Sequence, residues 1–170
     1  MLKLWSASAI ALWLIFDPAP NTKKAPPFPL PEFMEDMVYI EGGTYTRGCD
    51  QFGREHGGPA HQVRLQEFVI DKHEVTNLKF EAVFPGHHNR RSRFSHCGDC
   101  PVTKVTWYDA AEFCYITGKA LPSEAQWEKA AGGENGCEFP WGPDFDSKNL
   151  QGRGGLKLKD GASPVGSFPL

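Results

Sequence analysis

CPVTKVTWYDAAEFCYITGKALPSEAQWEKAAGG, residues 100–133, is the part of this chain whose local pattern predicts the most structure. Residues 101–107 are rich in β-branched side chains, which predicts a short strand with Val105 and Trp107 on one face. Thr106 can then cap a helix, and Gly118 suits its end, where a left-handed backbone conformation is needed. The apolar side of this helix is formed by Ala110, Ala111, Phe113 and Cys114.

A second helix is predicted after the loop that contains Leu121. Ser123 and Gln126 have the spacing of a capping box, in which each side chain bonds a backbone amide at the start of the helix. Trp127 and Ala131 are four residues apart, so they share a face that we expect to be buried, with Trp127 in the core. The residues of this helix that we expect to stay in solvent are Glu124, Glu128 and Lys129.

The segment upstream predicts short strands and one further helix. The expected strands are residues 37–40, 44–46, 63–65 and 68–70. The first two flank Gly42-Gly43 and are predicted to pair as a hairpin, because glycine tolerates the positive φ of a tight turn. The last two are predicted to continue one another as a half-buried strand. A helix is expected over residues 78–83, with Thr76 or Asn77 as its N-cap.

The N-terminal part differs in composition from the rest. Residues 4–16 are apolar apart from two serines, and this run is short against the ~20 residues that span a bilayer. A removed signal peptide, an uncleaved membrane anchor and a buried strand or helix are the three interpretations. The proline-rich segment that follows predicts an extended spacer. We therefore expect a signal peptide or anchor over residues 1–16, a linker over 17–36 and a folded domain over 37–170.

Charge and cysteine content narrow the classes of partner and compartment. The formal net charge is −3, and no basic stripe with aromatic partners is present, so nucleic-acid binding is not expected. The basic run 90–93 is predicted to be a solvated loop, or else a contact for phosphate or sulfate. Five cysteines suit an exported protein, periplasmic or extracellular, where disulfides persist.

Cys97-Gly98-Asp99-Cys100 is the one closely spaced pair of cysteines. A zinc site could recruit a nearby histidine but lacks a second ligand pair at regular spacing. A redox dithiol would favour a helix N-terminus, whereas this pair precedes the predicted strand. We therefore expect a structural disulfide, either within the pair or from one member to another cysteine. The disulfide candidates are Cys49, Cys97, Cys100, Cys114 and Cys137.

Five blocks in order resemble the formylglycine-generating, or sulfatase-modifying factor, family. They are IEGGTY at 40–45, VIDKHEVTN at 69–77, GKALPSEAQWE at 118–128, FPWG at 139–142 and PVGSFP at 164–169. Ala120 stands where that family usually has arginine. The resemblance implies an α+β, C-type-lectin-like fold of the formylglycine-generating enzymes, with a small twisted antiparallel sheet, two helices and a high loop content.

The resemblance also carries expectations about metals. Calcium commonly braces the irregular half of this fold, and hard oxygen ligands on a loop suit Ca²⁺. The positions that resemble its ligands are the Asn149 side chain, the Leu150 carbonyl and Asp160; as turn residues, Asn149 and Asp160 would have a purely structural role. Catalytic relatives hold copper with a later cysteine pair, and related sulfoxide synthases hold iron with histidines of a separate domain. Neither a copper nor an iron site is recognisable here.

Two functional hypotheses follow. Because this sequence ends before the family's active-site region, we expect a C-terminally incomplete, non-catalytic module. It would be exported, anchored to a membrane through residues 4–16 if these are retained, and would serve as an accessory or binding subunit with a protein partner in a larger assembly. The alternative is an oxidoreductase of the formylglycine-generating type, acting on a protein cysteine, whose catalytic part is missing from this chain.

Overall fold

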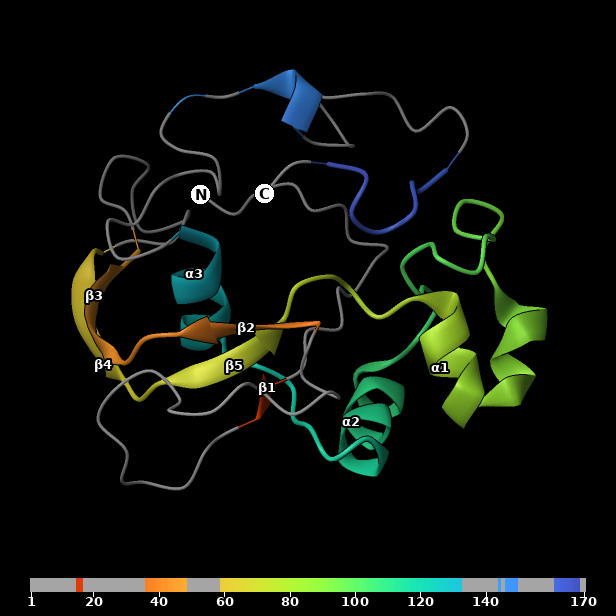
Figure 1. The fold of residues 1–170 in the computed structure, drawn as a ribbon, viewed down its shortest axis with the longest axis horizontal. Coiled ribbons are helices and arrows are strands. Elements are labelled where there is room, and N and C mark those ends of the chain that lie inside the picture. Colours follow the sequence, from red (N-terminus) through yellow and green to blue (C-terminus); the bar gives the residue numbers. More distant parts are fainter. Residues whose placement is uncertain are drawn as a thin grey trace.

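The computed structural model describes residues 15–16, 36–48, 59–132, 144, 146–149 and 161–168. The elements in chain order are β1 (Ile15–Phe16), β2 (Met37–Ile40), β3 (Gly43–Arg47), β4 (His61–Leu65), β5 (Phe68–Asp71), α1 (Asn77–Val83), η3 (Pro85–Arg90), α2 (Trp107–Ile116), α3 (Glu124–Gly132) and η4 (Ser147–Asn149), where η marks a 3₁₀ helix. The fold is α+β, as predicted. Figure 1 shows the strands and α3 on one side of the molecule and α1 and α2 on the other.

The first sheet has three strands in the order β1-β5-β2, and both pairings are antiparallel. All four residues of the central strand β5 are buried. Phe68 and Ile70 pack on one face together with Ala130 of α3, while Val69 packs on the other face with Met37 and Tyr39. A strand with apolar contacts on both faces reads as a continuous apolar run rather than an alternating one.

The second sheet pairs β3 with β4, from Gly43 opposite Leu65 to Arg47 opposite His61. The predicted hairpin between residues 37–40 and 44–46 is therefore wrong, although both strands exist. A Cβ on Gly42 would lie 2.7 Å from the backbone nitrogen of Glu67, so the chain passes close to the β4–β5 connection at this point. This close approach carries the chain from one sheet to the other instead of reversing it. β4 and β5 belong to different sheets, so the prediction that they continue one another is also wrong.

The local helix signals are confirmed. Thr76 caps α1 by accepting a hydrogen bond from the backbone N–H of Lys79. Thr106 caps α2 in a reciprocal capping box with Asp109. At α3 the backbone N–H of Gln126 donates to Ser123 Oγ, as the capping-box spacing predicts. These contacts satisfy amide groups that have no partner inside their helices.

The strand predicted over residues 101–107 is wrong. Pro101 forms only an isolated bridge to Thr76, and Trp107 is already the first residue of α2. Lys104 has a φ of 57°, a left-handed conformation that interrupts an extended chain. The β-branched residues of this segment serve the core instead of a sheet, because Val102 and Val105 are both buried.

The burial of α3 differs from the prediction. Glu128, expected in solvent, is half-buried, and its carboxylate accepts a hydrogen bond from the Gly48 backbone N–H at 2.6 Å. Trp127 is half-buried rather than part of the core. Lys129, expected in solvent, is 3% exposed, and its ammonium group donates to the carbonyl of Glu41. A lysine can bury its aliphatic stem where its head finds an acceptor. The helix thus covers the strands with a lysine stem in addition to its apolar residues, and Tyr45 of β3 completes the contact by donating to the Ala125 carbonyl at 2.7 Å.

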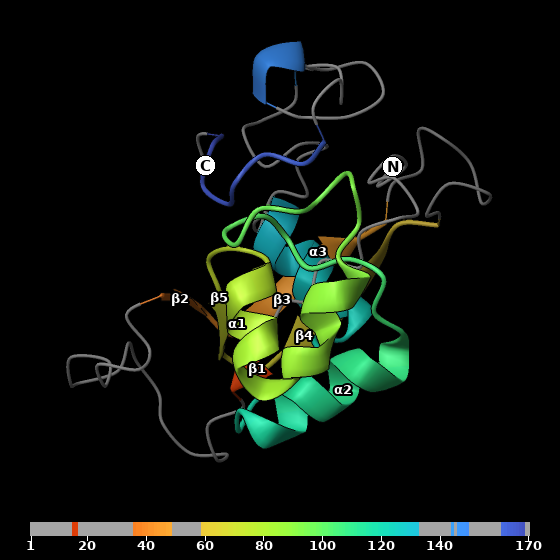
Figure 2. The same cartoon turned by 90° about the vertical axis from the view of Figure 1, so that its right-hand side faces the viewer.

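The main core lies between α1 and α2, which Figure 2 shows face-on. Its buried members are Val75, Phe80, Val102, Val105, Ala110, Phe113 and Cys114. Phe80 is at the centre, with its ring stacked on Phe113 at a centroid distance of 5.2 Å. Of the helices that the structure describes, none combines the length and the apolar character needed to cross a bilayer.

Candidate functional site

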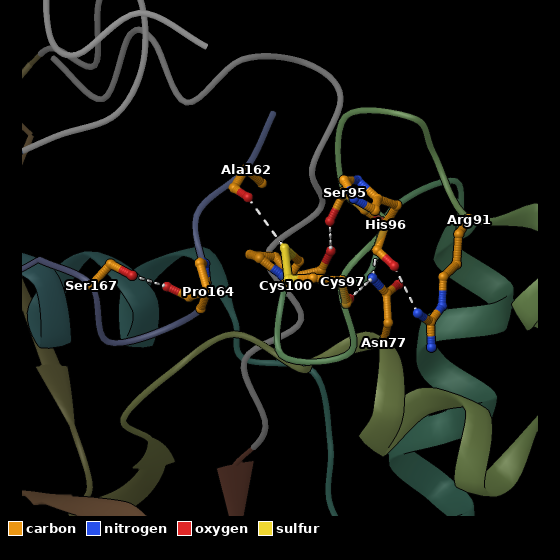
Figure 3. The surroundings of a disulfide bond; sticks show 10 residues. Asn77, Arg91, Ser95, His96, Cys97, Cys100, Ala162, Pro164 and Ser167 are labelled. Atoms are coloured by element: carbon orange, nitrogen blue, oxygen red, sulfur yellow. Dashed lines mark hydrogen bonds between the residues drawn. A yellow bond between two sulfur atoms is a disulfide. The ribbon is translucent and has the colours of Figure 1, made fainter. Parts of the chain in front are cut away.

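The candidate site is the loop of residues 91–102, which a disulfide closes and Asn77 holds in place. Asn77 is fully buried at the start of α1. Its Nδ2 donates to the carbonyls of Ser95 at 2.9 Å and Cys97 at 2.8 Å, as Figure 3 shows. Its backbone N–H donates to the carbonyl of Cys100 at 3.0 Å. One residue therefore fixes the loop at three points.

Cys97 and Cys100 form a disulfide with an S–S distance of 2.01 Å, the first of the two pairings that the sequence left open. Cys100 is 3% exposed. Its Sγ lies 3.2 Å from the carbonyl oxygen of Ala162. Because a disulfide sulfur carries no proton, this is a contact rather than a hydrogen bond. The pair is therefore packed into the structure and touches the C-terminal segment.

The C-terminal segment 161–168 runs against this loop. Ala162 N–H donates to the Phe94 carbonyl at 2.5 Å, and Val165 N–H donates to the Asp99 carbonyl at 2.9 Å. Gly161 has a φ of 93°, and a Cβ there would lie 2.5 Å from the Phe94 oxygen. A residue with a side chain cannot take this position without movement of the backbone. The loop thus joins α1 to a segment more than sixty positions further along the chain.

Arg91 anchors the other end of the loop. Its guanidinium makes two hydrogen bonds to Glu81 of α1, at 2.6 Å and 2.5 Å, and a third to the His96 carbonyl at 2.7 Å. The hydrogen bond from Arg91 holds the pKa of Glu81 below its usual value. Arg91 is therefore structural, so the prediction of a solvated basic loop is wrong at this residue. Arg90 and Arg93 are exposed, as predicted.

A second polar feature lies between the two helices of the core. Lys119 Nζ donates to both carboxylate oxygens of Asp71, at 2.7 Å and 3.0 Å. Burial raises the pKa of Asp71, and the hydrogen bond and charge of Lys119 oppose that rise. Both residues line a cavity of about 320 Å³, whose walls include Val75, Val83 and Phe113. Lys79 and Thr117 also line the cavity, so its walls combine apolar side chains with the Asp71–Lys119 ion pair and two further polar residues.

The remaining cysteines offer little thiol chemistry in the described part of the chain. Cys114 is buried, and desolvation raises the pKa of its thiol to about 11. At neutral pH it is therefore protonated and behaves as a small apolar residue. Cys49 and Cys137, the other disulfide candidates, lie outside the described residues.

The structure places one of the three positions that resemble calcium ligands. Asn149 is half-buried at the end of η4, where its backbone N–H donates to the Asp146 carbonyl at 3.1 Å. Leu150 and Asp160 lie outside the described residues, so the three are not brought together here. Within the described ranges no three His, Cys, Asp or Glu side chains form a group that could hold a metal ion. The calcium site stays a prediction.

Sequence reasoning missed the two residues that organise this site. The sequence predicts for Asn77 only the role of an N-cap, which Thr76 fills, and for Arg91 a solvated loop or a contact for phosphate or sulfate. Asn77 donates to carbonyls 18 and 20 positions away, and Arg91 donates to Glu81, ten positions away, and to the His96 carbonyl, five positions away. The sequence contains one signal for the role of Asn77. It is a polar residue directly after the cap Thr76, at a position on the buried side of α1.

Comparison with known proteins shows which family and which relatives this chain is similar to. A family model described as the sulfatase-modifying factor enzyme 1-like domain matches residues 23–170. The serine/threonine-protein kinase Pkn1 of Chlamydia trachomatis is 31% identical over 159 residues, which is 80% of this chain and 25% of the kinase. The formylglycine-generating enzyme of Thermomonospora curvata is 28% identical over 185 residues, 79% of this chain and 60% of the enzyme.

A third relative carries a different description. The inactive C-alpha-formylglycine-generating enzyme 2 of Mus musculus is 30% identical over 190 residues, which is 78% of this chain and 62% of that protein. The chain therefore spans between a quarter and two thirds of the length of these curated relatives. Similarity thus extends to proteins named as enzymes and to one named as inactive.

Proposed function

Since this chain belongs to the sulfatase-modifying factor enzyme 1-like domain family, we propose that it is a non-catalytic module of that family. In this proposal it is exported, tethered to a membrane through residues 4–16, and acts as an accessory or binding subunit of a larger assembly. Fold alone does not decide between an enzyme and a binding module, because chemistry depends on the site that a fold carries. The chemistry open to this chain therefore depends on the state of its cysteines.

The observation that carries the proposal is the disulfide between Cys97 and Cys100. Oxidation of a protein cysteine by oxygen needs a redox metal held by soft or imidazole ligands with an open position. The closely spaced cysteine pair is bonded to itself and packed against Ala162, and Cys114 is buried with a pKa of about 11. The described cysteines thus support a structural role in this chain rather than a catalytic one.

The relatives support a role within an assembly. In Pkn1 of Chlamydia trachomatis the matched region is 25% of the protein, so a domain of this kind can form one part of a longer chain. The mouse relative is described as inactive, so this family also includes members that have been given a non-catalytic description. Both observations favour a module that binds or supports another protein over an independent enzyme.

The runner-up is an oxidoreductase of the formylglycine-generating type. The similarity to the formylglycine-generating enzyme of Thermomonospora curvata, over 79% of this chain, favours it. In this case the metal ligands would lie outside the described residues or on another chain. The two hypotheses differ in what the purified chain can do to a cysteine peptide.

The test is an assay of aldehyde formation. We would incubate the full chain with copper, oxygen and a cysteine peptide of the sulfatase type, and detect aldehyde by mass spectrometry after trapping with a hydrazine. The enzyme of Thermomonospora curvata serves as the positive control. We expect no conversion by this chain. Aldehyde formation by the chain alone that requires copper would overturn the proposal in favour of the runner-up.

A separate experiment tests export and tethering. We would express the full chain in a bacterial host, separate periplasm, membrane and cytoplasm, and measure the intact mass of the protein in each fraction. The proposal predicts a membrane fraction whose mass includes residues 1–16. A shorter periplasmic form would replace the anchor with a removed signal peptide, and a cytoplasmic form would contradict export altogether.

A further inference from the structure

The disulfide between Cys97 and Cys100 closes a ring of residues 97–100, here called the cysteine ring. Its two cysteines differ in access to solvent. Cys100 is 3% exposed, whereas Cys97 is half-buried and Asp99 between them is exposed. Thiol–disulfide exchange begins when a thiolate attacks one of the two sulfurs, and access to that sulfur helps to determine the rate. The cysteine that a reductant can reach in the folded chain is therefore Cys97.

The cysteine ring is attached to the start of α1 by hydrogen bonds that do not involve sulfur. The Cys97 carbonyl accepts from the side chain of Asn77 at 2.8 Å. The Gly98 carbonyl accepts from the backbone N–H of Leu78 at 3.0 Å, and the Cys100 carbonyl accepts from the backbone N–H of Asn77 at 3.0 Å. Three carbonyls of the ring are thus bonded to α1. Opening the S–S bond removes none of these donors or acceptors.

The C-terminal segment 161–168 is attached to the other side of the ring. The Asp99 carbonyl accepts from the Val165 N–H at 2.9 Å, and the Ala162 carbonyl oxygen lies 3.2 Å from the buried sulfur of the ring. A further hydrogen bond joins the Ala162 N–H to the Phe94 carbonyl, outside the ring. Figure 3 shows the disulfide between this segment and the start of α1. The ring therefore joins two distant parts of the chain.

Closing the ring fixes the peptide group that carries the Asp99 carbonyl. When the S–S bond opens, the residues between the two cysteines regain backbone freedom, and Gly98, which has no side chain, regains the most. The Asp99 carbonyl is then no longer held toward the Val165 N–H. The thiol that Cys100 gains can donate to the Ala162 carbonyl, but an S–H group is a weak donor. Reduction should therefore loosen the C-terminal segment more than it loosens the ring on α1.

We propose that the Cys97–Cys100 bond is a reversible latch, which a dithiol opens by attack on Cys97 and which then releases the C-terminal segment. The attacking thiolate forms a mixed disulfide with Cys97, while Cys100 leaves as a thiolate and takes up a proton. The second thiol of the reductant then displaces Cys97 as a thiol, and the reductant becomes a disulfide. Oxidation closes the latch again, because the ring stays on α1 and keeps its two sulfurs close together. This inference does not depend on the proposed tether or assembly.

Opening the latch uncovers His73. Gly166 has a φ of 74°, and a Cβ placed on it would lie 3.4 Å from the nearest atom of the His73 ring. The C-terminal segment therefore runs directly over this imidazole, which is half-buried in the closed state. The open state exposes a polar ring that the closed state covers. This change can be measured separately from the motion of the segment itself.

The first arm of the experiment identifies the sulfur that is attacked. We would treat the folded full chain with glutathione, alkylate the free thiols with N-ethylmaleimide, and locate both labels by peptide mass spectrometry. We expect glutathione on Cys97 and maleimide on Cys100. Glutathione mainly on Cys100, or no reaction until the chain is unfolded by urea, would overturn the inference.

The second arm measures amide hydrogen exchange by NMR in the oxidised chain and in the chain reduced with dithiothreitol. Exchange at Ala162 and Val165 should become about tenfold faster on reduction, because part of the constraint of the closed ring acts on this segment. The amides of Asn77 and Leu78, which bond to the ring, should change much less. An equal rise at all four amides would show that the whole loop unfolds, and unchanged exchange at Ala162 and Val165 would show that the bond is no latch. Either result overturns the inference.

The double variant Cys97→Ser/Cys100→Ser is the matched control. It retains the other three of the five cysteines, so a response to dithiothreitol that persists in the variant belongs to another bond and overturns the assignment. His73 supplies an independent readout. After the reductant is removed without air, modification of His73 by diethyl pyrocarbonate should be faster in the reduced chain than in the oxidised one, while that of the exposed His61 should be unchanged. If His73 stays equally protected in both states, the segment is not released and the inference is overturned.

Discussion

At the scale of single residues, Asn77 holds the candidate site through its side chain and its backbone. Its amide group is fully buried and donates to two carbonyls of the loop, those of Ser95 and Cys97. A buried carbonyl that loses its donor keeps the cost of its desolvation. The contribution of Asn77 therefore exceeds that of an ordinary exposed hydrogen bond.

Removing this amide should loosen the loop. We predict that Asn77→Ala lowers the free energy of unfolding by about 1–3 kcal/mol, the usual cost of an unsatisfied buried polar group. Urea denaturation of the full chain measures it. Asn89→Ala, on the exposed side of η3, is the matched control and should change stability by less than about 0.5 kcal/mol. Equal effects of the two variants would contradict the role given to Asn77.

His87 gives the fold a dependence on pH. Its side chain is 1% exposed and packs edge-on against Phe80 at 5.0 Å. Burial lowers the pKa of His87 below 6.5, the nearby Arg90 lowers it further, and the charges of Glu81 and Asp109 act in the opposite direction. Because the folded state has the lower pKa, protonation favours the unfolded chain. The stabilisation is present in full above about pH 6.5 and is lost as the pH falls below that value.

We therefore predict that the urea midpoint of the wild type falls between about pH 7.5 and pH 5.5, and that it falls less in His87→Leu. The measurement is the difference between the two midpoints within each protein, so a general loss of stability in the variant does not affect it. His96→Leu, which replaces an exposed ring, should retain the dependence of the wild type. An unchanged pH dependence in His87→Leu would assign the effect to other groups.

At the scale of elements, the parts that the sequence predicts well are those formed by neighbours along the chain. The capping boxes at Thr106 and Ser123 and the left-handed Gly118 need only residues within about four positions. The pairing of β2 with β5 brings Met37 opposite Asp71, and no local pattern specifies that partner. Strand pairing between distant segments depends on the whole core, so the predicted hairpin failed while its two strands were found.

The disulfide-closed loop is a separate element whose stability can be measured. Cys97 and Cys100 are three positions apart, so the bond constrains a very short loop. The chain-entropy estimate for four residues is about 2 kcal/mol. We predict a loss of about that size in the double variant Cys97→Ser/Cys100→Ser, together with faster amide exchange at Ala162 and Val165, which bond to this loop. Unchanged exchange at both amides would show that the bond does not hold the C-terminal segment.

At the scale of the whole molecule, the order of the sequence blocks predicted the family and the fold class, and both are confirmed. The same blocks did not predict the site, because Asn77 and Arg91 act through backbone carbonyls of a loop with no regular pattern. Trp107 is the exposed first residue of α2, although the sequence pattern predicts it in a strand. Family resemblance thus predicts the shared architecture, while the surface of this chain has to be read from its structure.

Calcium binding by residues 149–160 remains a proposal. If Asn149, Leu150 and Asp160 supply oxygen ligands, the ion would bind the folded state and stabilise it by mass action. For a weak extracellular-type site, with a dissociation constant of about 0.1–1 mM, roughly 10 mM Ca²⁺ should add about 1–3 kcal/mol. The melting temperature should rise from EDTA to Ca²⁺, and by much less in Asn149→Ala.

Mg²⁺ at the same concentration is the control, since it demands a stricter octahedral geometry and keeps its waters. An equal shift with both ions, or with both proteins, would remove the site.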